Sequence, residues 1–253
     1  MNLAFVLGTA GSGKSDLTAT FTRWLELQGE DVIAVNLDPG SLVLPYSANV
    51  DVRDYIRVED IMEEYGLGPN GGLMLACDTM VEMVDDLARD IDDFGPDLAI
   101  IDTPGQMELF AFRDIGARIA EGLSDESKCI IYLFDSGFCR DPLNYVMNMF
   151  LVSAINSRFL LPQISVLSKA DLLEEEELEE VSGWSEDHLL LEEAINKRLL
   201  GMNRVMSQDV LEIVGRIGLE FAPIPFSTRT NMGFNVLFAQ ISRVLMRADP
   251  FTP

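Results

Sequence analysis

The chain has 253 residues, enough for one large domain or two small ones, and 48% of them are apolar, so it can bury a sizeable core. Its formal net charge of -24 argues against sequence-independent nucleic-acid binding, which rests on Lys and Arg neutralising phosphates. We expect no membrane span and no signal peptide, because no apolar run is long enough and the first residues carry no charged n-region. The Cys count of 3, without C-x-x-C spacing, argues against a disulfide framework and favours the reducing cytoplasm.

The stretch Gly8–Ser15 reads Gly-Thr-Ala-Gly-Ser-Gly-Lys-Ser and follows an apolar run at residues 3–7. This is the G-x-x-x-x-G-K-[ST] phosphate loop in its strand–loop–helix setting. Its glycines let the backbone curl so that N–H groups point at the phosphates, and the helix N-terminus adds partial positive charge. Lys14 is expected to reach the β- and γ-phosphates, and the Ser15 hydroxyl to ligate Mg²⁺. The sequence therefore predicts a nucleoside triphosphate site, bound by Gly11, Ser12, Gly13, Lys14 and Ser15.

Hydrophobic periodicity predicts the other elements. The predicted strands are 32–36, 97–102, 128–135, 163–167 and 223–228. The predicted helices are 16–29, 58–65, 73–93, 110–123, 143–161, 184–200, 205–217 and 233–246. Residues 41–57 read as irregular, Gly66–Gly72 as a turn cluster because Pro-Asn-Gly is strong turn chemistry, and 174–180 as the acidic first turns of a helix. The alternation predicts a single α/β domain over 1–253, with a mostly parallel central sheet flanked by helices and with helical insertions.

Acidic residues follow two of these strands, where ligands bind in such sheets. Asp38, in Leu-Asp-Pro-Gly, is either a turn former before proline or a group near Mg²⁺ or the attacking water. Asp102 stands where a Walker-B acid holds the Mg²⁺ shell. In the segment that follows, Gly105 offers an N–H to the γ-phosphate and Gln106 is suited to orient a hydrolytic water. Glu108 is either a water-positioning group or a solvated acid.

The strand at 163–167 runs into Ser168-Lys169-Ala170-Asp171, which matches the base-recognition box [NST]-K-x-D. The Asp171 carboxylate can accept from N1–H and N2–H₂ of guanine, which adenine does not offer, and the Lys169 stem would pack across the ring. Ser168 replaces the usual Asn, so one orienting hydrogen bond differs. The final strand ends in a loop that would approach the base through backbone N–H groups near Ser227. This box favours GTP over ATP.

Taken together, the motifs resemble those of the GPN-loop GTPase family, in the compact form found in archaea. They follow the family's order and cover the chain from residue 2 to about 230. The matching segments are Gly8–Ser15, Asp38-Pro39, Leu44-Pro45-Tyr46, Asp51–Tyr55, Gly66–Gly71, Asp102–Glu108, Cys139–Pro142 and Ser168–Asp171.

The resemblance implies a P-loop GTPase domain with a GPN-loop insertion at about 58–93 and a helical insertion at about 174–219. It also implies a nucleotide-dependent homodimer in which the loop Gly68-Pro69-Asn70 reaches the phosphate region of the partner's site. No Arg stands at a motif position to act as an arginine finger, so the Asn70 amide and backbone N–H groups would take that place and turnover would be slow. Asp38, Gln106 and Glu108 would then position water, with Ser15 and Asp102 at the Mg²⁺.

The leading hypothesis is a homodimeric GTPase that binds GTP, GDP and Mg²⁺ and acts as a switch or assembly factor for protein partners. Eukaryotic relatives are tied to the transcription machinery, and neither nucleic acid nor a membrane is expected as a direct partner. An alternative is a P-loop phosphotransferase, similar to a nucleoside or polynucleotide kinase, although the chain is poor in Lys and Arg for a lid. A third hypothesis is a nucleotide-binding module with negligible turnover. The acidic surface would also fit a salty cytoplasm.

Overall fold

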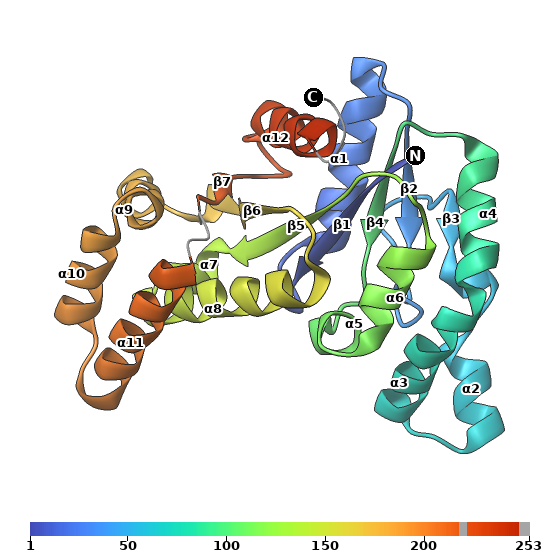
Figure 1. The fold of residues 1–253 in the computed structure, drawn as a ribbon, viewed down its shortest axis with the longest axis horizontal. Coiled ribbons are helices and arrows are strands. Elements are labelled where there is room, and N and C mark those ends of the chain that lie inside the picture. The colour runs from blue at the N-terminus through green and yellow to red at the C-terminus, as the bar shows by residue number, and fades with distance from the viewer. Residues whose placement is uncertain (218–221, 248–253) are drawn as a thin grey trace.

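The computed structural model describes residues 1–217 and 222–247. In these residues seven strands form one sheet in the order β3-β2-β4-β1-β5-β6-β7 (Figure 1). All of its strand pairs are parallel, which confirms the predicted α/β fold. The strands are β1 (Asn2–Gly8), β2 (Val32–Asn36), β3 (Val50–Asp51), β4 (Leu98–Asp102), β5 (Lys128–Asp135), β6 (Gln163–Ser168) and β7 (Ile224–Pro225).

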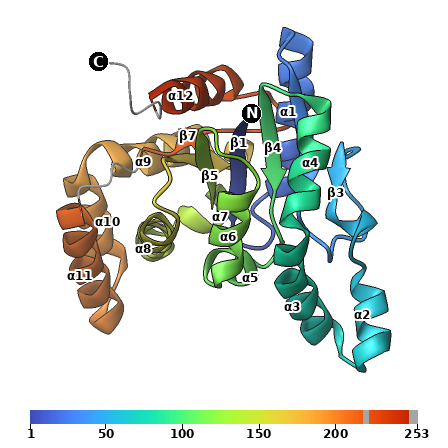
Figure 2. The same cartoon turned by 45° about the vertical axis from the view of Figure 1, so that its right-hand side comes forward.

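Both faces of the sheet are covered by helices (Figures 1 and 2). Successive side chains of a strand point to opposite faces, so Phe5 belongs to one core and Val6 to the other. Burial on both faces explains why the strands read as continuous apolar runs. One face packs against α1 (Lys14–Gln28) and α12 (Phe234–Arg247), and the other against α4 (Val84–Phe94), α5 (Met107–Ala111), α6 (Asp114–Gly122) and α8 (Pro142–Phe159).

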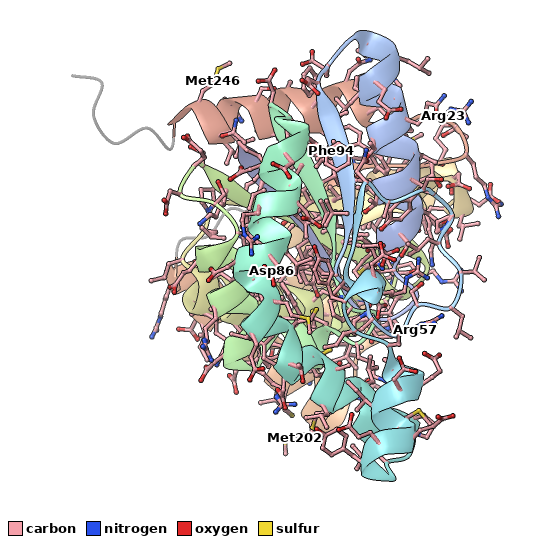
Figure 3. All side chains as sticks on the ribbon, turned by 90° about the vertical axis from the view of Figure 1, so that its right-hand side faces the viewer. Arg23, Arg57, Asp86, Phe94, Met202 and Met246 are labelled. Atoms are coloured by element: carbon pink, nitrogen blue, oxygen red, sulfur yellow. The ribbon has the colours of Figure 1, made fainter. Side chains whose placement is uncertain are left out.

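Two helices form an arm that extends past the C-terminal ends of the strands (Figure 1). They are α2 (Val58–Tyr65) and α3 (Pro69–Thr79), and they pack closely on each other. Figure 3 shows the arm below α4, with Arg57 at the base of α2. The predicted loop Gly68-Pro69-Asn70 lies at the end of the arm where α3 begins, and all three residues are exposed. The arm therefore carries this loop away from the sheet.

A second group of helices lies beyond α8, at the other side of the molecule: α9 (Glu175–Glu186), α10 (His188–Arg198) and α11 (Gly201–Ile217). The buried ring of Trp184 fixes α9 against α8, because it packs edge-on against Tyr145 with centroids 5.4 Å apart. Arg198 of α10 lies over the same ring. These helices fall within the predicted insertion at 174–219, whose residues 218 and 219 lie outside the described residues. No described helix combines the length and apolar character needed to cross a membrane.

The sequence prediction was wrong at the start of the arm's second helix. Gly66–Gly72 was expected to be a turn cluster, but α3 begins inside it, at Pro69. Proline suits the first position of a helix, since its φ is already helical and its missing N–H has no partner there. The same chemistry that marks a turn therefore marks a helix start at this position.

Other predicted helices are interrupted. The helix expected over 73–93 is broken by a 3₁₀ turn at Met80–Met83, and the one expected over 110–123 is two helices, α5 and α6. The predicted helix 184–200 begins at His188, because the Asp187 side chain caps that helix by accepting from the Leu189 N–H. The segment 41–57, expected to be irregular, contains the short strand β3 and a 3₁₀ turn at Val52–Asp54.

Candidate nucleotide-binding site

The register of the sheet brings the chemically important strand ends together. Asp102, at the end of β4, lies opposite both Val6 of β1 and Asn36 of β2. On the other side of β1, Asp135 at the end of β5 lies opposite Ser168 of β6. The loop after β1 is therefore flanked by acids from both neighbouring strands, at the edge where parallel sheets bind ligands.

The phosphate loop has the backbone that its glycines predict. Gly11 and Gly13 adopt φ values of 77° and 93°, a left-handed conformation that other residues rarely adopt. The Ser168 hydroxyl donates to the Ser12 carbonyl at 2.7 Å and ties the loop to the end of β6. Ser12, a residue of the loop, is fully buried. The loop is thus fixed from below, with its N–H groups at the start of α1.

Lys14 is buried at the first position of α1. Its Nζ donates to the carbonyls of Gly8 at 2.9 Å, Thr9 at 3.2 Å and Gly105 at 3.2 Å. Burial lowers the pKa of Lys14, and the negative charges of nearby Asp102, Asp38 and Glu108 oppose this. The ammonium therefore lies between the phosphate loop and the segment after β4, with three carboxylates around it.

Asp102 is completely buried, and burial raises its pKa to about 6. The Tyr46 hydroxyl donates to its Oδ2 at 3.0 Å. Among the described residues, Oδ1 has no partner with hydrogen-bond geometry, although the Ser15 hydroxyl lies near enough to lower the pKa. A buried carboxylate oxygen without a partner, next to a hydroxyl, is a ligand pair that suits a hard cation such as Mg²⁺. The residues present therefore fit the metal that the sequence predicted.

Asp38 is held tightly where β2 ends. Its Oδ2 accepts from the Gly105 N–H at 2.9 Å, and its Oδ1 accepts from the Gly40 N–H at 2.9 Å. Gln106 and Glu108 come directly after Gly105, at the start of α5, and both are exposed. Asp38 is therefore bonded to the segment that carries these two predicted water-positioning residues.

The predicted base-recognition box follows β6. Lys169 adopts a left-handed backbone (φ 56°), and its Nζ donates to the Gly11 carbonyl and to Asp135 Oδ2, the latter at 2.7 Å. The Ser136 hydroxyl donates to the Lys169 carbonyl at 2.7 Å. The end of β5 thus holds Lys169 at both its side chain and its backbone, across the phosphate loop.

The other predicted base contacts lie beside Lys169. Asp171 is partly exposed in the 3₁₀ turn Ala170–Leu172. Ser227 is fully buried; its N–H donates to the Met232 carbonyl at 3.1 Å, and its hydroxyl accepts from the N–H groups of Arg229 and Thr230. Ser227 therefore shapes the turn after β7, and the N–H groups available toward a base are those of the residues around it.

A cavity of about 440 Å³ lies over the phosphate loop. It brings together seven predicted site residues: Gly11, Gly13, Lys14, Ser15, Asp38, Gly105 and Lys169. Asp102 and Ser12 are buried below it. The predicted residues outside its lining are Gln106, Glu108, Asp171, Ser227 and, on the arm, Gly68, Pro69 and Asn70.

Sequence reasoning assigned no role to three residues that the structure ties to this site. Tyr46 binds Asp102, while Asp135 and Ser136 hold Lys169. Asp135 could have been identified from the sequence, since it ends a buried strand as Asp102 does. Only its place in the Leu44-Pro45-Tyr46 motif pointed to Tyr46.

Comparison with known proteins gives a consistent result. Residues 6–247 match the family model described as a conserved hypothetical ATP binding protein. A GPN-loop GTPase of Pyrococcus abyssi is 40% identical over 189 residues, or 74% of each chain, and GPN-loop GTPase 3 of Dictyostelium discoideum is 29% identical over 260 residues, covering 100% of this chain and 90% of the relative. The crystal structure of the P. abyssi GTPase in its apo form superposes with a TM-score of 0.85 at 34% identity, over 96% of this chain and 97% of that one. The chain thus belongs to the GPN-loop GTPase family, and it is a GTPase built on this family's seven-stranded parallel sheet.

Proposed function

We propose that this GTPase works as a homodimer and acts as a nucleotide-dependent switch or assembly factor for protein partners. The observation that supports this best is the division of the predicted site residues between two places. Lys14, Asp38 and Gly105 line one cavity, whereas the loop Gly68-Pro69-Asn70 is exposed at the end of the α2–α3 arm. A second copy of the chain would supply that loop to the cavity, as the family resemblance implies.

Ser15, which lines the cavity, and the buried Asp102 would hold Mg²⁺. When bound, the ion neutralises charge on the β- and γ-phosphate oxygens. Lys14 and the N–H groups of Gly11, Ser12, Gly13 and Gly105 would bind those phosphates. The partnerless Oδ1 of Asp102 supports the assignment of the metal ligands.

For the base, Lys169 would pack along the ring while Asp171 accepts from N1–H and N2–H₂ of guanine, with backbone donors near Ser227 contacting the remaining edge. The hydrogen bonds of Lys169 with Asp135 and Ser136 support this assignment, because they fix Lys169 beside the phosphate loop. GTP and GDP would thereby be preferred over adenine nucleotides.

For hydrolysis, Asp38, Gln106 and Glu108 would position the attacking water. Asn70 and the backbone of Gly68 and Pro69, from the partner, would stabilise charge on the transferred phosphoryl group. These donors are neutral, so they stabilise this charge less than an arginine would, and slow turnover is expected.

The surface supports protein partners, in the cytoplasm, over nucleic acid. A net charge of -24 repels a polyanion, whereas it suits proteins with basic surfaces. By family resemblance, the transcription machinery is the class of client to examine first.

The first test is phosphate release from GTP with Mg²⁺ over a wide range of protein concentration, with ATP and sizing of the GTP-bound protein alongside. GTP-selective release that falls on dilution, together with a dimer on sizing, is the expected result. Constant specific activity from a monomer would contradict the shared site. Phosphate transferred to an added nucleoside instead of water would indicate a phosphotransferase.

Mixing two inactive variants tests where Asn70 acts. Asn70→Ala should lose the donor given to the partner, and Gln106→Ala should lose its own water-positioning group. If the loop acts across the dimer, a mixed dimer contains one intact site, and an equal mixture should recover roughly a quarter of wild-type activity. If Asn70 acts within its own chain, mixing will restore nothing.

A further inference from the structure

The carboxylate of Asp38 is already fully engaged by backbone donors. Oδ2 accepts from Gly105 N–H and Oδ1 from Gly40 N–H, each at 2.9 Å. The backbone of Asp38 is fixed as well, because the buried Asn36 side chain accepts from its N–H at 3.0 Å and donates to its carbonyl at 3.2 Å. Hydrogen bonds to both carboxylate oxygens and to the backbone therefore hold Asp38 in place.

The contacts of the Asp38 carboxylate are those expected of a γ-phosphate oxygen. The Gly105 N–H is the donor assigned above to the γ-phosphate, and it points at Asp38. The neighbouring Gly105 carbonyl accepts from Lys14, whose ammonium is close enough to Asp38 for a direct charge interaction. Asp38 thus combines an N–H···O⁻ hydrogen bond with attraction to the phosphate-loop lysine, as a phosphate oxygen would.

We propose that Asp38 is a stand-in for the γ-phosphate and a specificity-determining residue that distinguishes GTP from GDP. This proposal rests on the assignment of Gly105 as a γ-phosphate donor. GDP ends at the β-phosphate, so it binds while Asp38 keeps its bond to Gly105. GTP places a second anion at the same N–H, and because two anions repel each other there, it binds only by displacing Asp38. Displacement also frees the carboxylate to contact the attacking water.

The same contact links the site to the arm. Gly40, the second donor to Asp38, packs so closely under Leu73 that a Cβ at Gly40 would lie 2.8 Å from Leu73 Cδ1. Leu73 belongs to α3, the helix that begins at Pro69 beside Asn70. Moving Asp38 away from Gly105 therefore shifts Gly40 against α3. Binding of the γ-phosphate would in this way move the loop Gly68-Pro69-Asn70 that is offered to the partner.

The test compares the affinities of GDP and of a non-hydrolysable GTP analogue by titration calorimetry. In Asp38→Asn the oxygen can still accept from Gly40, but the side chain has no second acceptor for Gly105. Asp38→Ala removes both bonds. A hydrogen bond to a charged group is worth a factor of roughly ten to a hundred, so each variant should raise the analogue-to-GDP affinity ratio by about tenfold or more.

Asp16→Asn is the matched control. Asp16 is exposed at the rim of the same cavity, and its replacement removes an equal charge without touching Gly105. Removing the Asp16 charge should change the analogue-to-GDP affinity ratio by less than about threefold, because solvent screens exposed charges. Thermal unfolding of each variant checks that it is folded.

Two outcomes would overturn the proposal: an unchanged ratio in both Asp38 variants, or the same change in Asp16→Asn. Because the readout is binding, it is independent of hydrolysis. Loss of hydrolysis with an unchanged ratio would leave Asp38 as a water-positioning residue and exclude its role as a stand-in. A raised ratio in a protein that never releases phosphate would support the stand-in and refute the proposed turnover.

Discussion

Asp38, Asp102 and Asp135 each stand at or just after the end of a parallel strand, yet their surroundings differ. Asp102 is fully buried, Asp38 is engaged by backbone N–H groups, and Asp135 pairs with Lys169 at 2.7 Å. Burial raises the pKa of Asp102 to about 6, which leaves a carboxylate that a cation would stabilise strongly. Three strand ends thus give a candidate metal ligand, the proposed γ-phosphate stand-in and the ion-pair partner of Lys169.

One residue-scale prediction concerns the base. Asp171→Asn replaces an acceptor with an amide that can donate to the 2-carbonyl of xanthine but cannot accept from both guanine groups. We expect GTP affinity to fall roughly ten- to a hundredfold and XTP affinity to rise. Competition binding with GTP, XTP and ATP measures this. Similar loss for all three nucleotides would show that Asp171 acts on folding and not on base recognition.

At the scale of elements, the α2–α3 arm depends on close packing between its two helices. Gly72 of α3 is buried against α2, and a Cβ there would lie 2.4 Å from Met62 Cγ and 3.3 Å from Val58 Cγ1. A glycine inside a helix costs stability, so close approach is its physical reason here. The neighbouring Gly71 has only ordinary contacts, at 3.5 Å from Leu67.

These neighbours offer a matched pair of variants. Gly72→Ala should overpack the arm and destabilise the protein by about 1–3 kcal/mol, with weaker GTP hydrolysis because the loop at Asn70 is displaced. Gly71→Ala should be neutral or stabilising by up to about 1 kcal/mol, since alanine favours the helix. Denaturant unfolding and phosphate release measure both. Equal stability of the two variants would contradict tight α2–α3 packing.

For the whole molecule, the strand order determines which residues meet at the site, and the net charge determines the electrostatics of the surface. Placing β1 between β4 and β5 brings acids from both neighbours to the phosphate loop. The net charge of -24, in contrast, spreads mutual repulsion over the surface and opposes the compact state.

Salt should therefore stabilise this protein. Screening of surface repulsion by monovalent salt is expected to add about 1 kcal/mol, or roughly 2–4 °C in melting temperature. The rise should occur mostly below about 0.2 M, where the Debye length falls to near 8 Å, and then level off. Thermal melts in a NaCl series test this, and a rise that begins only at molar salt would point to ion exclusion from apolar surface instead.

Local chemistry in the sequence was enough for six of the seven described strands and for the phosphate loop, but not for the short strand β3. Lys128–Asp135 was predicted with the bounds of β5, and Gly11 and Gly13 adopt positive φ values that let the phosphate loop curl as expected. Both features are local, since a run buried on both faces and a glycine's freedom need no distant partner. The motif order was likewise sufficient to indicate the family.

Tertiary structure decided what depends on distant partners. Residues 66–72 suit a turn or, with Pro69 at the first position, a helix, and the helix α3 that forms there packs against α2. The bonds from Asp38 to Gly105 and from Tyr46 to Asp102 join segments 67 and 56 residues apart. No periodicity encodes such pairs, because they arise only when the parallel register sets strand ends side by side. The sequence by itself thus determined which groups to expect at the candidate site, and the fold decided which of them touch.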